Sequence, residues 1–208
     1  MVTALEALAR LRDGNQRFVA GEHRTREISS PSRRDSLVAG QAPFAIILGC
    51  SDSRVPAEIV FNQGLGDLFV IRVAGNVVAA SQVGSVEFAA ERYGTRLVVV
   101  LGHSQCGAIQ ATVESLQNPG DAQSYNLRSI VDRVRPSVEP LMHTDLVNHP
   151  DELIHQAVRA NILASSNHLR HGSQLLEKLI ERDGLMVVGA EYSLETGVVE
   201  FFHGMPPA

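Results

Sequence analysis

Five residues in two short motifs could together hold and control a metal ion. Cys50, Asp52 and Arg54 stand in the sequence CSDSR, and His103 and Cys106 stand in GHSQC about fifty residues later. Thiolates, an imidazole and a carboxylate are donors that a tetrahedral Zn²⁺ accepts. A lone buried cysteine is usually inert and a lone histidine is usually only hydrogen-bonded, but these motifs contain both cysteines of the chain. The combination therefore predicts one zinc site per chain.

The fourth position on such an ion decides its chemistry. With Asp52 bound, the site is closed and resembles a structural zinc. With water bound, the ion is a Lewis acid that lowers the pKa of that water to roughly 7–9. Arg54 can hold Asp52 away from the metal through its planar guanidinium, although the same two residues could form a plain local ion pair. If the chain stays extended after Gly49, Cys50, Asp52 and Arg54 point to the same side.

Short apolar runs alternate with helical patterns along the chain and must position these residues. Strands are expected at 44–50, 67–75, 96–103 and 184–192, and helices at 79–94, 106–116, 124–141, 150–170 and 172–184. Such alternation predicts an α/β fold with a mainly parallel central sheet flanked by helices, and the run at 197–203 predicts an antiparallel edge strand. Cys50 and His103 each end a strand. Ligands bind beyond the carboxyl ends of parallel strands, so both motifs should converge at one edge of the sheet.

The N-terminal part differs in character from this core. Residues 2–20 carry leucines at helical spacing, and a polar, arginine-rich linker and a short helix follow. We expect one domain over 1–208, in which residues 1–40 form a helical arm and residues 41–208 form the α/β zinc-binding core. The apolar face of the arm helix has to be covered, and a second copy of the chain related by a two-fold axis would cover it.

Composition and charge exclude several classes of function. The net charge is −5, and the basic segment 23–34 lacks interleaved aromatic residues, so nucleic-acid binding is not expected. No apolar run is long enough to span a bilayer, and the first residues do not read as a signal peptide. Two cysteines do not make a disulfide scaffold. The sequence predicts a cytoplasmic protein that does not bind membranes.

The motifs together resemble the β-class carbonic anhydrases. CSDSRVPAE and GHSQCGA carry the resemblance, and GNQRFVAG, LGDLFVIRVAGN and GAEYSLETG extend it over about residues 5–203. It implies reversible hydration of CO₂ to bicarbonate and a proton, with Cys50, His103 and Cys106 as zinc ligands. It implies that Asp52 and Arg54 form a dyad that orients a zinc-bound hydroxide or, in some members, that Asp52 is the fourth ligand. It also implies a homodimer or homotetramer with the pocket at its interface.

The resemblance also assigns a small substrate pocket. Gln41 matches a glutamine that hydrogen-bonds substrate in plant-type members, and Phe69 matches a pocket-lining aromatic. Ala74 and Phe88 stand where those members have valine and tyrosine, so the pocket size and one hydroxyl differ. Gly107 flanks the second motif, where a close backbone approach needs a small residue. Without the resemblance, Gln41 would be interpreted as a surface loop residue and Phe69 as a core residue.

Two other functions could use the same residues. One is the hydrolysis of CS₂ or COS on the same zinc. The other is a non-catalytic protein with a structural Cys₂HisAsp zinc. Arg54 argues against this function, because it would compete with the zinc for the Asp52 carboxylate, and a permanent structural site needs that carboxylate on the metal. Bicarbonate regulation in some bacterial members rests on a tryptophan, an arginine and a late tyrosine. Arg72 and Tyr192 are present, but Ile47 replaces the tryptophan and the chain has no Trp. That form of regulation is not expected.

Overall fold

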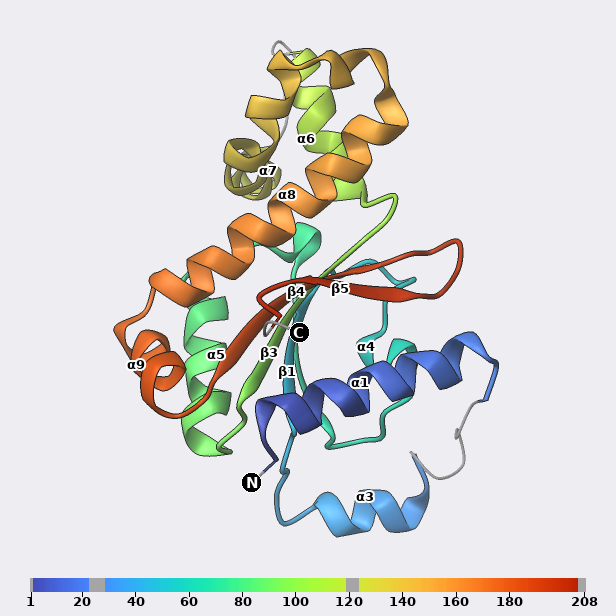
Figure 1. Ribbon diagram of the computed structural model, residues 1–208, viewed down its shortest axis with the longest axis vertical. Coiled ribbons are helices and arrows are strands. Elements are labelled where there is room, and N and C mark those ends of the chain that lie inside the picture. Colours follow the sequence, from blue (N-terminus) through green and yellow to red (C-terminus); the bar gives the residue numbers. More distant parts are fainter. Residues whose placement is uncertain (1, 23–28, 119–123, 206–208) are drawn as a thin grey trace.

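The fold is built on one five-stranded sheet in the order β2-β1-β3-β4-β5 (Figure 1). The computed structural model describes residues 2–22, 29–118 and 124–205, and most of the predicted linker lies outside these ranges. The strands are β1 (Ala45–Gly49), β2 (Leu68–Arg72), β3 (Leu97–His103), β4 (Met186–Tyr192) and β5 (Val199–His203). β1 to β4 are parallel, and β5 pairs with β4 in the antiparallel sense. The predicted fold class is confirmed.

Helices cover both faces of this sheet. The α-helices are α1 (Ala4–Val19), α3 (Pro31–Leu37), α4 (Ala57–Val60), α5 (Ala80–Arg92), α6 (Gly107–Gln117), α7 (Tyr125–Val138), α8 (Pro150–His171) and α9 (Gln174–Arg182). Three short 3₁₀ turns are η1 (Ala74–Asn76), η2 (Glu139–His143) and η3 (Asp145–Asn148). The helix predicted at 124–141 ends earlier, at Val138, because Pro140 at the start of η2 has no N–H to continue the ladder. No helix within the described ranges combines the length and the apolar character needed to cross a bilayer.

The two faces of the sheet are buried in separate apolar cores. Ile46 and Leu48 of β1 face the core formed with α5 to α9, whereas Ile47 faces the core covered by α1 and α4. This alternation follows from the two-residue repeat of a strand. Because both faces are covered, the strand sequences are continuous apolar runs. That is why their positions could be predicted.

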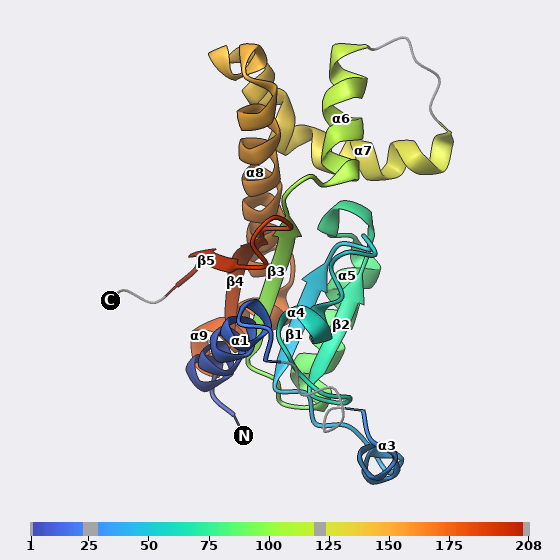
Figure 2. The same ribbon diagram turned by 90° about the vertical axis from the view of Figure 1, so that its right-hand side faces the viewer.

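The first helix packs on its own chain. Leu8 and Leu11 of α1 are buried in the core that contains Ile47 of β1, and a capping box between Thr3 and Glu6 fixes the start of the helix. The expectation that a second copy must cover this apolar face is therefore wrong. The arm-like element is α3, which has no buried residue and stands apart from the sheet (Figure 2).

A helical lobe continues beyond the carboxyl ends of the parallel strands. α6, α7 and the first half of α8 pack together there (Figure 2). The two predicted zinc motifs lie between the sheet and this lobe. One follows β1, and the other joins β3 to α6.

Candidate metal centre

The structure brings the three predicted zinc ligands together at the carboxyl edge of the sheet. Cys50 follows the last residue of β1, His103 ends β3, and Cys106 caps the start of α6. β1 and β3 are adjacent parallel strands, so their ends deliver the two motifs side by side. One ligand atom from each residue lies within 4.8 Å of the other two, and all three residues are buried. Cys50, His103 and Cys106 are called the ligand triad below.

The His103 ring is oriented as a metal ligand would be. Its Nδ1 lies 2.8 Å from the carbonyl oxygen of Ser104, to which it donates as N–H. Its Nε2 is buried and has no hydrogen-bond partner among the described residues. A buried polar atom without a partner is destabilising, and a backbone carbonyl on Nδ1 is the usual way in which a histidine is held to present its other nitrogen to a metal. The orphaned Nε2 therefore fits a metal ion.

The two thiols share one proton when no metal is bound. A hydrogen bond from Cys106 lowers the pKa of Cys50 to about 4, and His103 and the amides of Asp52 and Gly75 contribute to the same effect. The same hydrogen bond and burial raise the pKa of Cys106. The Asp52 and Gly75 amides each donate to the Cys50 sulfur at 3.4 Å. Zn²⁺ would be held by both thiolates and the neutral imidazole, a donor set whose two negative charges neutralise the ion.

The chain turns immediately after Asp52. Val55 N donates to the carbonyl of Asp52 at 3.1 Å, so the chain does not stay extended over residues 50–54, which was the condition for Cys50, Asp52 and Arg54 to point to the same side. The turn instead folds Arg54 back onto Asp52. Arg54 Nε and Nη2 donate to the two carboxylate oxygens at 2.9 and 2.8 Å, and its backbone amide donates at 3.0 Å. These bonds hold the pKa of Asp52 well below its usual range.

The Asp52 carboxylate lies beside the ligand triad. Its Oδ2 is 3.9 Å from Nε2 of His103, but Asp52 does not belong to the group of described residues whose ligand atoms all lie within 4.8 Å of one another. Arg54 also donates to the carbonyl of Gln105 at 3.2 Å, which ties the dyad to the loop between His103 and Cys106. The arrangement offers three residues that could bind a metal ion, with the Asp52 carboxylate held by Arg54.

Arg72 supports the site in a way that the sequence did not reveal. It ends β2, next to Gly49 in the strand register. Its Nε donates to the carbonyl of Cys50 at 2.9 Å, and its Nη2 donates to the carbonyl of Asp52 at 2.6 Å. One guanidinium therefore fixes the backbone that joins a ligand to the dyad. The strand register is the signal that could have placed Arg72 there.

Two of the predicted pocket residues lie next to the triad. Ala74 begins η1, and the following residue, Gly75, donates its amide to the Cys50 sulfur. Gly75 has a φ of +68°, and a Cβ there would lie 3.1 Å from the side chain of Ala108, so glycine is required. Gly107 is the first residue of α6, and a Cβ there would meet open space. The close backbone approach expected at Gly107 is therefore wrong.

The other three predicted pocket residues gather elsewhere. Gln41 donates to the hydroxyl of Tyr93 at 3.0 Å, and the rings of Phe69, Phe88 and Tyr93 lie with centroids 5.7 to 6.2 Å apart. Tyr93 was missed because no local pattern links it to Gln41. We call these four residues the aromatic group.

The aromatic group is separate from the ligand triad within one chain. Gln41 precedes the amino end of β1, whereas Cys50 follows its carboxyl end, and a strand of this length spans roughly 17 Å. The side chain of Phe88 is 52% exposed. One copy of the chain therefore does not bring the predicted pocket together.

Comparison with known proteins agrees with this geometry. Residues 45–199 match the carbonic anhydrase family. The chain is 40% identical over 189 residues to carbonic anhydrase 2 of Mycobacterium tuberculosis, with 90% of this chain and 87% of that protein covered. It is 41% identical over 192 residues to the carbonic anhydrase of Mycolicibacterium smegmatis, with 91% and 89% covered. Its fold is similar to that of the β-carbonic anhydrase CafA of Aspergillus fumigatus, with a TM-score of 0.74, 24% identity and coverage of 97% and 91%. The chain belongs to the β-class carbonic anhydrases.

Proposed function

We propose that this protein catalyses the reversible hydration of CO₂ to bicarbonate and a proton with one Zn²⁺ per chain. The observation that carries the proposal is the ligand triad, in which Nε2 of His103 has no partner, beside a carboxylate that Arg54 holds off the triad. Zn²⁺ bound by two thiolates and an imidazole polarises water and supplies a nucleophile near neutral pH. Both cysteines are free, and we infer a cytoplasmic location, because a reducing compartment keeps thiols available.

The chain's own residues orient and shield the reaction. The Asp52 carboxylate has lone pairs left for one more hydrogen bond beyond those from Arg54. It can accept that hydrogen bond from the attacking water and so orient the water molecule. Arg54 keeps the carboxylate ionised and in place. CO₂ carries no charge, so an apolar side chain such as Ala74, which begins η1 beside the triad, suits it. A structural Cys₂HisAsp zinc is disfavoured, because it would need Asp52 to leave two strong hydrogen bonds.

The direct test is stopped-flow CO₂ hydration on protein of known zinc content. We expect activity that is already present near neutral pH and rises up to about pH 9 as the attacking water is deprotonated. Protein stripped of zinc should be inactive and should recover when zinc is restored. One zinc per chain without CO₂ hydration at any pH would overturn the proposal and favour a different substrate or a structural metal.

We also propose a homodimer in which the aromatic group of one copy completes the pocket at the ligand triad of the other. The exposed ring of Phe88 and the separation of the aromatic group from its own triad support this. The end of α3 adjoins the aromatic group, since Leu37, Gln41 and Tyr93 line one hollow, and Val38 beside it is 86% exposed. Such an apolar surface is suited to a second copy.

A mixed dimer tests this arrangement. One chain carries Cys106→Ser and the other carries Gln41→Ala with Phe88→Ala, and two affinity tags isolate the heterodimer. Each parent homodimer should be defective, whereas the heterodimer contains one complete site and should show about half of the wild-type activity. If each site lies within one chain, the heterodimer will show no recovery beyond its parents. A wild-type dimer assembled with both tags is the matched control.

A further inference from the structure

A second cavity borders the candidate site and is lined by several groups that can accept a proton. Its volume is about 330 Å³, and we call it the Glu191 cavity. It is lined by Ser104, His155, Glu191, Ser193, Glu195, Thr196, Val198 and Glu200. A water molecule occupies about 30 Å³ in the liquid, so a cavity of this size with so many polar groups can hold several waters.

One part of the Glu191 cavity belongs to the loop that carries His103 and Cys106. Ser104 follows His103 in the chain, and its hydroxyl donates to Glu195 at 2.7 Å. That hydrogen bond lowers the pKa of Glu195, and the positive charge of Arg54 contributes to the shift. Glu195 therefore lies within electrostatic reach of the dyad. The cavity begins at the edge of the place where the reaction is proposed to occur.

His155, which α8 contributes, also lines the Glu191 cavity. Its side chain is 47% exposed, and its Nε2 lies 3.4 Å from the Glu191 carboxylate. Its Nδ1 lies 3.7 Å from Glu152. Arg159 contacts both Glu191 at 3.2 Å and Glu200 at 2.7 Å. His155 thus connects the inside of the cavity with solvent.

Carboxylates and a guanidinium lie around His155. Three carboxylates, of Glu152, Glu191 and Glu200, face it or lie within electrostatic reach, against the single positive charge of Arg159. Imidazole is the side chain that gains and loses a proton near neutral pH. The Glu191 carboxylate is only 9% exposed, so its interaction with His155 is weakly screened.

We propose that His155 is a proton-transfer residue, which takes up the proton released by CO₂ hydration through the Glu191 cavity and passes it to buffer. The inference rests on the proposed function. Each turnover converts CO₂ and H₂O into HCO₃⁻ and H⁺. Neutral His155 binds that proton at a ring nitrogen and becomes an imidazolium, and a buffer base then removes the proton and regenerates the neutral ring.

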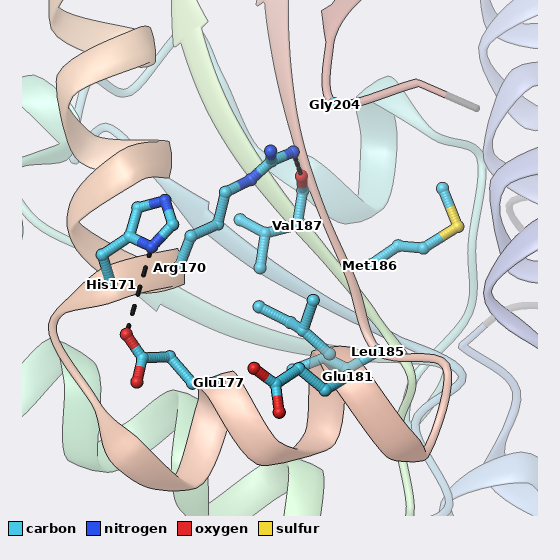
Figure 3. A pocket seen from close by; sticks show the side chains of 9 residues that line it. Arg170, His171, Glu177, Glu181, Leu185, Met186, Val187 and Gly204 are labelled. Carbon is cyan, nitrogen blue, oxygen red and sulfur yellow. Dashed lines mark hydrogen bonds and ion pairs between the residues drawn. The ribbon is translucent and has the colours of Figure 1, made fainter. Parts of the chain in front are cut away.

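His171 provides a matched control on the same helix. It lies at the other end of α8, 75% exposed and 4.0 Å from Glu177. It lines a different cavity, together with Arg170, Glu181 and Leu185, as Figure 3 shows. His171 therefore has a carboxylate neighbour and solvent contact, as His155 has, but it lacks the connection to Ser104 and Glu195.

The experiment measures CO₂ hydration at low and at high buffer concentration. At low buffer, we expect His155→Ala to be about tenfold slower than the wild type, in line with the loss of a proton-transfer group. At high buffer, the buffer carries the proton itself, so His155→Ala should approach the wild-type rate, and added imidazole should do the same. His171→Ala should match the wild type throughout. An equal loss at both concentrations, or no loss at either, would overturn the proposal.

This design separates two kinds of failure. If the proposed function is wrong, the wild type will hydrate no CO₂ even at high buffer, whereas a wrong assignment of His155 leaves that rate intact. A second readout does not depend on turnover. The ¹⁵N NMR signals of the His155 ring report its protonation state, and Glu191→Gln should change them because it removes the carboxylate that lies 3.4 Å from Nε2. A ring that keeps one protonation state from about pH 6 to 9 would contradict the proposal.

Discussion

Replacing Cys106 with serine is expected to give a folded protein that binds almost no zinc and hydrates CO₂ at least about a thousandfold more slowly than the wild type. A serine hydroxyl stays protonated at neutral pH, so the site loses one of the two thiolate charges that neutralise Zn²⁺. The side chain of Cys106 is 1% exposed, and serine is close to it in volume. The measurements are zinc per chain by elemental analysis and the rate of CO₂ hydration.

The fold of this variant should survive because hydrogen bonds hold the residues of the site in place. The serine hydroxyl can donate to the Cys50 sulfur as the Cys106 thiol does, and the Asp52 and Gly75 amides remain in place. Ser51→Ala, a change at an exposed neighbour of Cys50, is the matched control and should keep its zinc. Wild-type zinc content in Cys106→Ser would remove Cys106 from the set of ligands.

The sheet and the triad could be predicted from the sequence for the same physical reason. A strand buried on both faces is a short apolar run, and a reactive residue at the end of such a run stands out. Cys50 and His103 both stand there, and parallel strands bring their carboxyl ends to one edge. Fold class and ligand triad therefore depend on local patterns alone.

The remaining features depend on contacts between distant parts of the chain. Arg72 reaches the carbonyls of Cys50 and Asp52 because the pairing of β2 with β1 places it beside Gly49. Local sequence patterns do not determine this pairing register. Gln41 and Tyr93 likewise meet across 52 positions of sequence. The packing of α1 on its own sheet could not be predicted. An apolar helix face indicates that another surface covers it, but it does not indicate whether that surface belongs to the same chain or to a second copy.

Changes in the dyad should separate the two roles proposed for Asp52. Asp52→Asn keeps the shape of the side chain and removes its charge, so we expect zinc to be retained and the rate to fall about a hundredfold or more, the usual scale for a positioned group that handles the reacting water. Arg54→Ala removes the hydrogen bonds that hold Asp52 away from the triad. Asp52 is then free to become the fourth ligand, so this variant should also be slow and should bind zinc at least as tightly.

The double variant distinguishes these two mechanisms. Asparagine is a weaker zinc ligand than a carboxylate, so Asp52→Asn combined with Arg54→Ala should reopen the fourth position and be at least as active as Arg54→Ala alone. With Co²⁺ in place of Zn²⁺, the visible spectrum of Arg54→Ala should differ from that of the wild type, and the double variant should return toward the wild-type spectrum. The low pKa of Asp52 means that the ion pair with Arg54 is lost only as the pH falls far below neutral, so the comparison holds across the working pH range. If the losses in the two single variants simply add in the double variant, Arg54 does not act by holding Asp52 away from the metal.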